Sequence, residues 1–271
     1  IQAPVIGNLV FDDLGEAVLA KLNEAFRGRK GIEDKTEYKK DQPISNSNLP
    51  RALFYNQAVR ELTNNRLHVL TPEETVRYWD SIPERSTTYA DTSAVSVFPG
   101  EGPNEGLRKR ALEIAGIRKA ELPLLVSGLG VEPADNELGY TFKETDYIKT
   151  TEAPFLTHDG RLKYDLERGL VKSKDGVQTW TPSEQSGLRR AYRGRDDFLY
   201  FGDDGLLGSS SSGRVQLVSG AAAEKNLDSL LRNLQAERDK QAAEIEGKYQ
   251  DSLSELNTRR ERALRILKGE E

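Results

Sequence analysis

The most regular spacing of apolar residues lies in the C-terminal part of the chain. Residues 221–268 contain no proline and a single glycine, Gly247. Apolar side chains recur there at steps of three and four residues, and the pattern repeats every eleven residues. Three helical turns then span each repeat, at ~3.67 residues per turn, so the apolar stripe stays on one face of a helix. The stripe consists of Leu227, Leu231, Leu234, Ala242, Ile245, Tyr249, Leu253, Leu256, Leu264 and Leu267.

A helix over residues 221–268 would be ~70 Å long, which exceeds the width of a small domain. The rest of one chain cannot cover the stripe along that length. We therefore predict that the stripe is an interface with other copies of the chain or with neighbouring subunits. Arg238 and Arg260 interrupt the repeat, so helix register is expected to depend on what they contact. A hairpin bent at Gly247, or packing on the N-terminal helices, is the alternative.

The first 118 residues read as mainly helical. Apolar residues recur every four positions from Leu14 to Phe26, and Thr71, Pro72 and Glu74 form the pattern of a capping box with proline at the first helical position. The predicted helices cover residues 11–28, 48–65, 70–82 and 102–116. Asp12 or Asp13 is expected to cap the first of them and Asn104 the last. Between the last two helices, AVSVF, residues 94–98, is a candidate short strand. A charged segment over residues 29–48 is expected to be a loop or an arm that orders on binding.

Between residues 119 and 219 the chain consists of short runs rich in β-branched and aromatic residues, bounded by glycine, proline and aspartate. This pattern predicts strands joined by tight turns, in an antiparallel sheet, a barrel or a sandwich. The predicted fold class is α+β. It has a mainly helical region over residues 1–118 with a charged loop, a small antiparallel β-rich domain over 119–219, and a long C-terminal helix or coiled coil over 220–271.

Two short motifs carry aspartates that suggest chemistry. The sequence FLYFGDDG, residues 198–205, resembles the Gly-Asp-Asp turn of RNA-dependent RNA polymerases, which implies magnesium binding by Asp203 and Asp204. The sequence TYADTSAV, residues 88–95, resembles the Tyr-x-Asp-Thr-Asp motif of family B DNA polymerases, with Ser93 in place of the second aspartate. Neighbouring residues of a strand point to opposite faces, and Asp-Asp-Gly suits a tight hairpin turn. We interpret the first motif as a hairpin turn, with metal-dependent phosphoryl transfer as an alternative.

A second candidate site is an arginine-rich run just before that motif. Arginines that alternate with an aromatic residue can bind phosphate groups and stack on bases. Asp196 and Asp197 follow directly and reduce the positive charge. The residues predicted to contact nucleic acid under this alternative are Arg189, Arg190, Tyr192, Arg193 and Arg195.

Composition narrows the choice of function. The chain has 271 residues, 36% of them hydrophobic, and a net charge of −5, which argues against a surface that coats nucleic acid or anionic membranes. Cysteine is absent, so disulfides, thiol nucleophiles and cysteine-bound metals are excluded. Methionine is also absent, and the start at Ile1 suggests processing or trimming. Lacking both sulfur residues favours an extracellular or particle-borne protein.

No motif supplies a complete catalytic centre. The two histidines, His68 and His158, occur without a Gly-x-Ser-x-Gly elbow, and no phosphate-binding glycine loop with a lysine is present. No apolar run is long enough to cross a bilayer. We predict a non-catalytic assembly protein without cofactor or metal, which oligomerises through its C-terminal segment, as in a phage-like virion. Nucleic-acid association and metal-dependent catalysis remain the alternatives.

Overall fold

The computed structural model describes residues 4–219 together with 246–247, 249–250, 252–254, 256–257 and 259–260. The chain divides into two compact units, residues 1–224 and 225–271. The helices of the first unit are α1 (Asp13–Ala25), α2 (Leu49–Thr63), α3 (Pro72–Arg77) and α4 (Glu105–Ile114), with short 3-10 helices η1 (Trp79–Ser81) and η2 (Pro154–Thr157). Its strands are β1 (Ile6–Asn8), β2 (Leu67–Val69), β3 (Tyr89–Val97), β4 (Leu124–Ser127), β5 (Gly130–Pro133), β6 (Tyr140–Lys143), β7 (Lys149–Glu152), β8 (Gly160–Asp165), β9 (Gly169–Ser173), β10 (Val177–Trp180), β11 (Leu188–Arg193), β12 (Phe198–Asp203), β13 (Gly213–Arg214) and β14 (Gln216–Ser219).

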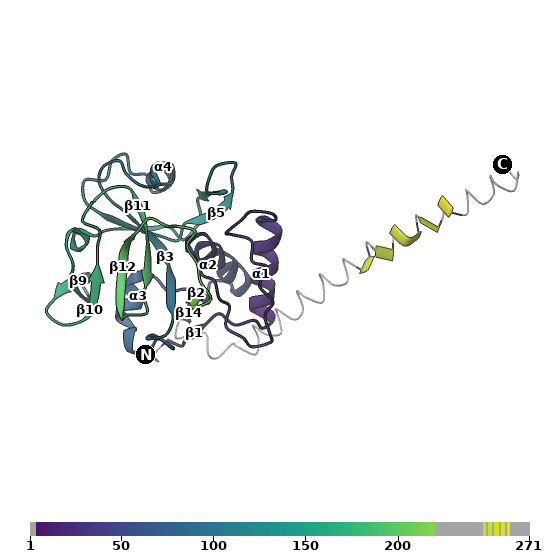
Figure 1. The fold of residues 1–271 in the computed structure, drawn as a ribbon, viewed down its shortest axis with the longest axis horizontal. Coiled ribbons are helices and arrows are strands. Elements are labelled where there is room, and N and C mark those ends of the chain that lie inside the picture. Colours follow the sequence, from purple (N-terminus) through teal and green to yellow (C-terminus); the bar gives the residue numbers. More distant parts are fainter. Residues whose placement is uncertain are drawn as a thin grey trace, which may run out of the picture. The chain divides into compact units, whose positions relative to one another are not determined.

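A curled nine-stranded sheet dominates the first unit (Figure 1). Its strands follow the order β7-β4-β3-β11-β12-β10-β8-β9, and β13 pairs in parallel with β3. All neighbours along the order are antiparallel except β10 and β12, which are parallel. The remaining strands form two small sheets, β1-β14-β2 and β5-β6. The first and last strands, β1 and β14, therefore lie side by side.

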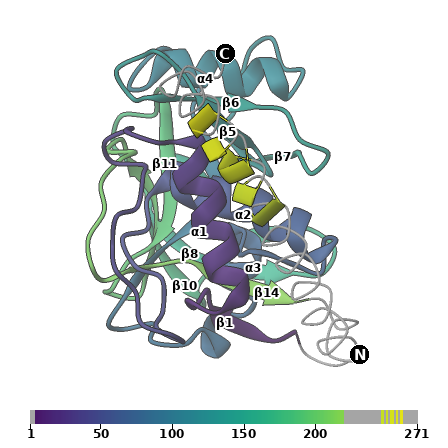
Figure 2. The same cartoon turned by 90° about the vertical axis from the view of Figure 1, so that its right-hand side faces the viewer.

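Strand β3, near the centre of the large sheet, consists mainly of small and apolar residues. Every residue of β3 after Tyr89 is buried, as expected for a strand with neighbours on each side and cover above and below. On one flank α2 packs against β2 and β3, and α1 packs against α2, facing the viewer in Figure 2. One buried cluster comprises Val76, Phe98, Leu125, Ala153, Phe155, Leu156, Leu162, Leu170, Val177, Ala191, Leu199 and Phe201.

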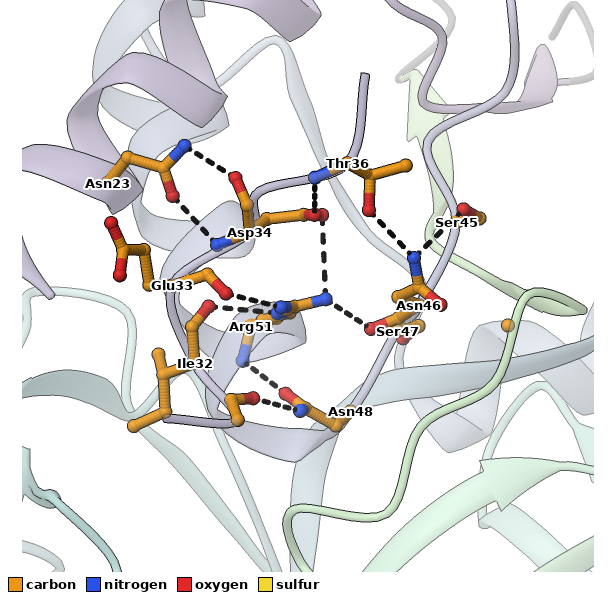
Figure 3. A network of polar contacts seen from close by, with 12 residues as sticks. Asn23, Ile32, Glu33, Asp34, Thr36, Ser45, Asn46, Ser47, Asn48 and Arg51 are labelled. Carbon is orange, nitrogen blue, oxygen red and sulfur yellow. Dashed lines mark hydrogen bonds and ion pairs between the residues drawn. The ribbon is translucent and has the colours of Figure 1, made fainter. Parts of the chain in front are cut away.

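The charged segment that follows α1 is ordered by one buried arginine at the start of α2 (Figure 3). Arg51 donates through Nε to the carbonyl of Ile32 (2.9 Å) and through Nη2 to that of Glu33 (2.7 Å). Its Nη1 forms an ion pair with the buried Asp34 at 3.4 Å and donates to the carbonyl of Asn46 at 2.8 Å. The guanidinium thus satisfies carbonyl groups that a loop leaves without partners. The segment is a loop, as predicted, and internal contacts hold it in place.

The predicted N-terminal caps are confirmed at two helices, where a side chain accepts a hydrogen bond from a backbone amide of the first turn. Asp12 caps α1 by accepting from the amide of Gly15, and Thr71 and Glu74 form the reciprocal capping box of α3. Asn104 occupies the N-cap position of α4, as predicted, but its side chain makes no capping hydrogen bond. It donates instead to the carbonyls of Leu188 and Asp204.

The predicted fold class is wrong. The described part of the chain is mostly β, and its helices are short, the longest being the 15-residue α2. The region up to residue 118 contributes β3 to the centre of the large sheet, so the strands do not form a small domain of their own. The described part contains no long C-terminal helix. Most of the predicted helix over 220–271 lies outside the described residues, including Leu227, Leu231, Leu234, Ala242, Ile245, Leu264 and Leu267.

Candidate binding pocket on strands β3, β11 and β12

The two polymerase-like motifs meet in the sheet, on either side of an arginine. Asp91 lies on β3 and Asp203 on β12, and β11 between them carries Arg190. Arg190 donates to both carboxylate oxygens of Asp91, through Nε at 2.8 Å and through Nη2 at 3.0 Å. Its Nη1 lies 3.4 Å from Oδ2 of Asp203 and 2.9 Å from the carbonyl of Gly208. The carboxylates of the two motifs thus share one guanidinium.

The charge of Arg190 is held in place by this pairing. Burial on its own lowers the pKa of the guanidinium, but the carboxylates of Asp91 and Asp203 outweigh burial and raise it above its usual range. Bidentate pairing of this kind is the strongest form of a charge-assisted hydrogen bond. Asp91 also accepts from the hydroxyl of Ser47 at 2.7 Å. Asp91 is therefore committed to internal partners.

The Asp-Asp-Gly segment lies at the end of β12, but it does not connect β12 to a strand that pairs with it. Asp203 accepts from the amide of Gly205 at 2.8 Å, which forms a tight turn at the end of β12. The next strand, β13, pairs with β3 and not with β12, so the predicted hairpin is wrong. The neighbouring Asp204 lies 3.8 Å from Nη1 of Arg189. In the described part of the chain, no three His, Asp or Glu side chains are grouped closely enough to hold a metal ion.

An open cavity of about 600 Å³ lies beside this ion-pair cluster. Arg190 and Arg195 supply two cations to its lining, and Asp196 and Asp203 supply two carboxylates, so the lining is neutral overall. Such a balance does not provide the positive surface that attracts a phosphate backbone. The other lining residues are Tyr89, Tyr192, Gly194, Tyr200, Gly208, Ser209 and Ser210.

Three tyrosines form the wall of this cavity. Tyr192 and Tyr200 stack with ring centroids 5.0 Å apart, and Tyr89 meets Tyr192 edge to face at 6.2 Å. The guanidinium of Arg190 lies 4.7 Å from the ring centroid of Tyr192. Burial, followed by the charge of Asp203, raises the pKa of Tyr192 to about 12. Its phenol is therefore neutral at physiological pH and offers a hydrogen bond without a charge.

The arginine-rich run is divided between the interior and this cavity. Arg189, Arg190 and Arg193 are buried, and their guanidinium groups donate to carbonyl oxygens or carboxylates of the protein. Of the residues predicted to contact nucleic acid, only Tyr192 and Arg195 line the cavity with accessible groups. In the described part of the chain, the exposed Arg195 forms neither an ion pair nor a side-chain hydrogen bond. Arg195 is therefore the arginine of this run whose guanidinium group is available to a ligand.

Sequence reasoning missed Tyr89 and Asp91 as members of the site. Both lie in TYADTSAV, about one hundred positions before the residues that they contact. Asp91 and Arg190 are 99 residues apart, and Tyr89 and Ser210 are 121 residues apart. The sequence of this motif indicated only a resemblance to a DNA polymerase motif. No neighbouring residue indicated that Tyr89 and Asp91 would contact the arginine-rich run.

The second compact unit contributes described residues from the predicted apolar stripe. Tyr249, Leu253 and Leu256 lie at helical positions and are 59%, 41% and 63% exposed. Their spacing of four and then three residues places them on one face of a helix. Large apolar side chains exposed together are unusual on the surface of a monomer.

Comparison with known proteins found no matching family model, no matching curated protein and no matching solved structure. No helix among the described residues is long and apolar enough to cross a bilayer.

Proposed function

We propose that this protein is a non-catalytic building block that self-associates through the helical face bearing Tyr249, Leu253 and Leu256. The observation that carries this proposal is the joint exposure of these three apolar side chains on one helical face. The partner is a second copy of the chain, because an identical stripe offers the same spacing of apolar positions. The β-rich unit is then the body that the association brings together.

The physical reason is the cost of leaving the stripe in water. Full burial of a leucine side chain contributes ~1.5–3 kcal/mol relative to exposure, and a tyrosine ring adds comparable apolar area. Leu253 and Leu256 keep about half of their surface exposed, at 41% and 63%. Contact with an identical face would remove most of that surface from water. The sequence has the same spacing of apolar residues on both sides of these positions.

Light scattering coupled to size-exclusion chromatography tests the proposal on the full chain. The wild type should elute with a mass that is a multiple of the 30.3 kDa protomer. The double variant Leu253→Lys/Leu256→Lys should shift to the protomer mass, because two charges would be buried against their own copies. Gln250→Lys/Ser254→Lys is the matched control: it adds the same two charges at exposed positions, each one residue after a stripe residue and therefore about 100° around the helix. This control should leave the mass unchanged.

A wild type that elutes as a protomer even at ~100 µM would remove the basis for this function, since association follows mass action. An oligomer that persists in the double variant would place the interface elsewhere. That result would likewise contradict the role given to the stripe.

A further inference from the structure

A second cavity, of about 280 Å³, lies among α2, α3 and strands β4, β7 and β8. Its volume is at the lower end of the range for ligand sites, ~300–1,000 Å³, so it suits a small molecule. Its charged lining residues are Arg60, His68, Glu73, Glu74, Arg77 and Lys149. The argument rests on how these charges pair.

Both carboxylates of the lining are already engaged. Glu73 accepts from Nζ of Lys149 at 2.8 Å. Glu74 lies 2.7 Å from Nε2 of His68, and its other oxygen accepts from the amide of Thr71 at 2.9 Å as part of the α3 capping box. Neither carboxylate forms an ion pair with an arginine of the cavity. After these two pairs are assigned, two positively charged residues of the lining have no carboxylate partner in the cavity.

Those two cations, Arg60 and Arg77, form no ion pair within the described part of the chain. Each is held against an aromatic ring: the guanidinium of Arg60 lies 4.8 Å from the ring centroid of Tyr147, and that of Arg77 lies 4.9 Å from that of Tyr164. A guanidinium that lies over a ring keeps its N–H edge free for a planar, two-pronged contact. Within the part of the chain that the structure describes, the side chain of Arg60 makes one hydrogen bond, from Nε to Oδ1 of Asn56 at 3.3 Å.

We propose that this cavity binds a small oxyanion, a phosphate group that is free or carried by a small molecule, between Arg60 and Arg77. Two fixed guanidinium groups with free edges match the paired oxygens of such an anion. Thr151, which also lines the cavity and whose hydroxyl has no hydrogen-bond partner among the described residues, offers a further donor. The site is separate from the helical stripe, so this inference goes beyond the proposed function and can fail without affecting it.

The partly buried state of Arg60 supports the assignment. Burial lowers the pKa of Arg60, and the nearby carboxylate of Glu74 opposes that effect only in part. A bound anion would restore to this guanidinium the favourable electrostatic environment that burial removes. The rest of the surface carries an excess of acid, with a net charge of −5 for the chain, so unspecific attraction does not favour the same anion elsewhere.

Isothermal titration calorimetry with inorganic phosphate tests the site on the full chain, at an ionic strength held constant with sodium chloride. The wild type should show saturable binding. Arg77→Ala, at an exposed position, and Arg60→Gln should each weaken binding at least ~10-fold, the loss expected for a hydrogen bond to a charged group. Arg27→Ala removes one exposed arginine elsewhere on the surface and should leave the affinity unchanged.

Parallel titrations separate the sources of the phosphate group. Tighter binding of glycerol phosphate than of inorganic phosphate, lost in Arg77→Ala, would place the group on a small molecule; equal binding would indicate the free ion. Absence of saturable phosphate binding would overturn the proposal, and so would equal affinity in the wild type and both cavity variants. Binding of a short single-stranded oligonucleotide without binding of inorganic phosphate would overturn it as well.

Discussion

Removing the carboxylate of Asp91 should destabilise the β-rich unit more than removing any other aspartate of the candidate pocket. Asp91 and Arg190 are 2% and 3% exposed, and two hydrogen bonds of 2.8 and 3.0 Å join them. In Asp91→Ala the buried guanidinium loses its bidentate partner, and the hydroxyl of Ser47 loses its acceptor. Breaking a buried pair from one side costs ~3–5 kcal/mol, and we expect a value in that range.

Asp203 provides the internal comparison because it faces the same guanidinium from the solvent side. Its side chain is 34% exposed and lies 3.4 Å from Nη1 of Arg190. A pair that reaches solvent contributes about 0–1 kcal/mol. The lost acceptor of the Gly205 amide adds about 1 kcal/mol, so Asp203→Ala should cost less than ~2 kcal/mol. The difference between the two variants measures how much burial and geometry add to one Arg–Asp contact.

Urea unfolding followed by tryptophan fluorescence measures both variants. The two tryptophans, Trp79 and Trp180, lie in the β-rich unit, so the signal reports that unit. With a slope of ~2–3 kcal/mol per molar urea, Asp91→Ala should lower the midpoint by about 1–2 M. Replacing both partners, as Asp91→Leu/Arg190→Met, should recover part of the loss because no uncompensated charge remains. A loss below ~1 kcal/mol for Asp91→Ala, or an equal loss for Asp203→Ala, would refute this account.

Three further outcomes are expected. Burial on its own raises the pKa of Glu74, but its bonds to His68 and Thr71 outweigh burial and lower the pKa. The ionised carboxylate should therefore stabilise the fold at pH values above its unfolded pKa of about 4.3. This stabilisation should be lost as the pH falls through the lower pKa of the folded state. The stability difference between wild type and Glu74→Gln, followed by urea unfolding from pH 7 to pH 3, checks this. Tyr140→Phe should raise stability by up to ~1–2 kcal/mol, because the buried hydroxyl has no hydrogen-bond partner, and an unfolding midpoint below that of the wild type would contradict it. Gly128→Ala should cost several times more than Gly100→Ala in thermal unfolding: both glycines have positive φ, worth ~1–2 kcal/mol each, but only at position 128 would the new methyl overlap the carbonyl of Tyr147.

Sequence reasoning succeeded where a signal and its partner lie a few residues apart. The caps at Asp12 and Thr71 were readable because the accepting side chain and the donating amide are three positions apart. The same holds for the period of α1, whose apolar face packs in the core. Each of these features depends on residues that are close together in the sequence, so it does not depend on how the rest of the chain folds.

The sheet could not be predicted in the same way, because its pairings join distant segments. β3 lies in a region predicted to be mainly helical, where only AVSVF, residues 94–98, indicated a short strand, and it pairs with β11 about one hundred residues later. The parallel pairing of β10 with β12 likewise has no local sign. The Asp-Asp-Gly turn was assigned to a hairpin because the following segment was assumed to return along β12. It continues instead to β3.

The arginine-rich run gives no local sign that its arginines are buried. β11 lies between β3 and β12 in the middle of the sheet, five of its six residues are buried, and its register shifts between Arg190 and Tyr192. A central strand tolerates arginine only where each N–H finds an acceptor. For Arg190, these acceptors are Asp91, Asp203 and the loop that begins at Gly205. No pattern within the strand reveals them.

Buried arginines therefore have a common role in this fold, which explains why a strand so rich in them is not a positive surface. Arg193, fully buried, donates to the carbonyls of Arg85 and Thr88, and burial lowers its pKa to about 10. Arg51 does the same for the loop before α2, and Arg190 for the loop after β12. Long loops leave carbonyl groups that no ladder satisfies, and a guanidinium offers five donors in one plane to reach several of them. Among the arginines that line the two cavities, those that no loop engages are Arg195 beside the tyrosines and Arg60 and Arg77 in the smaller cavity.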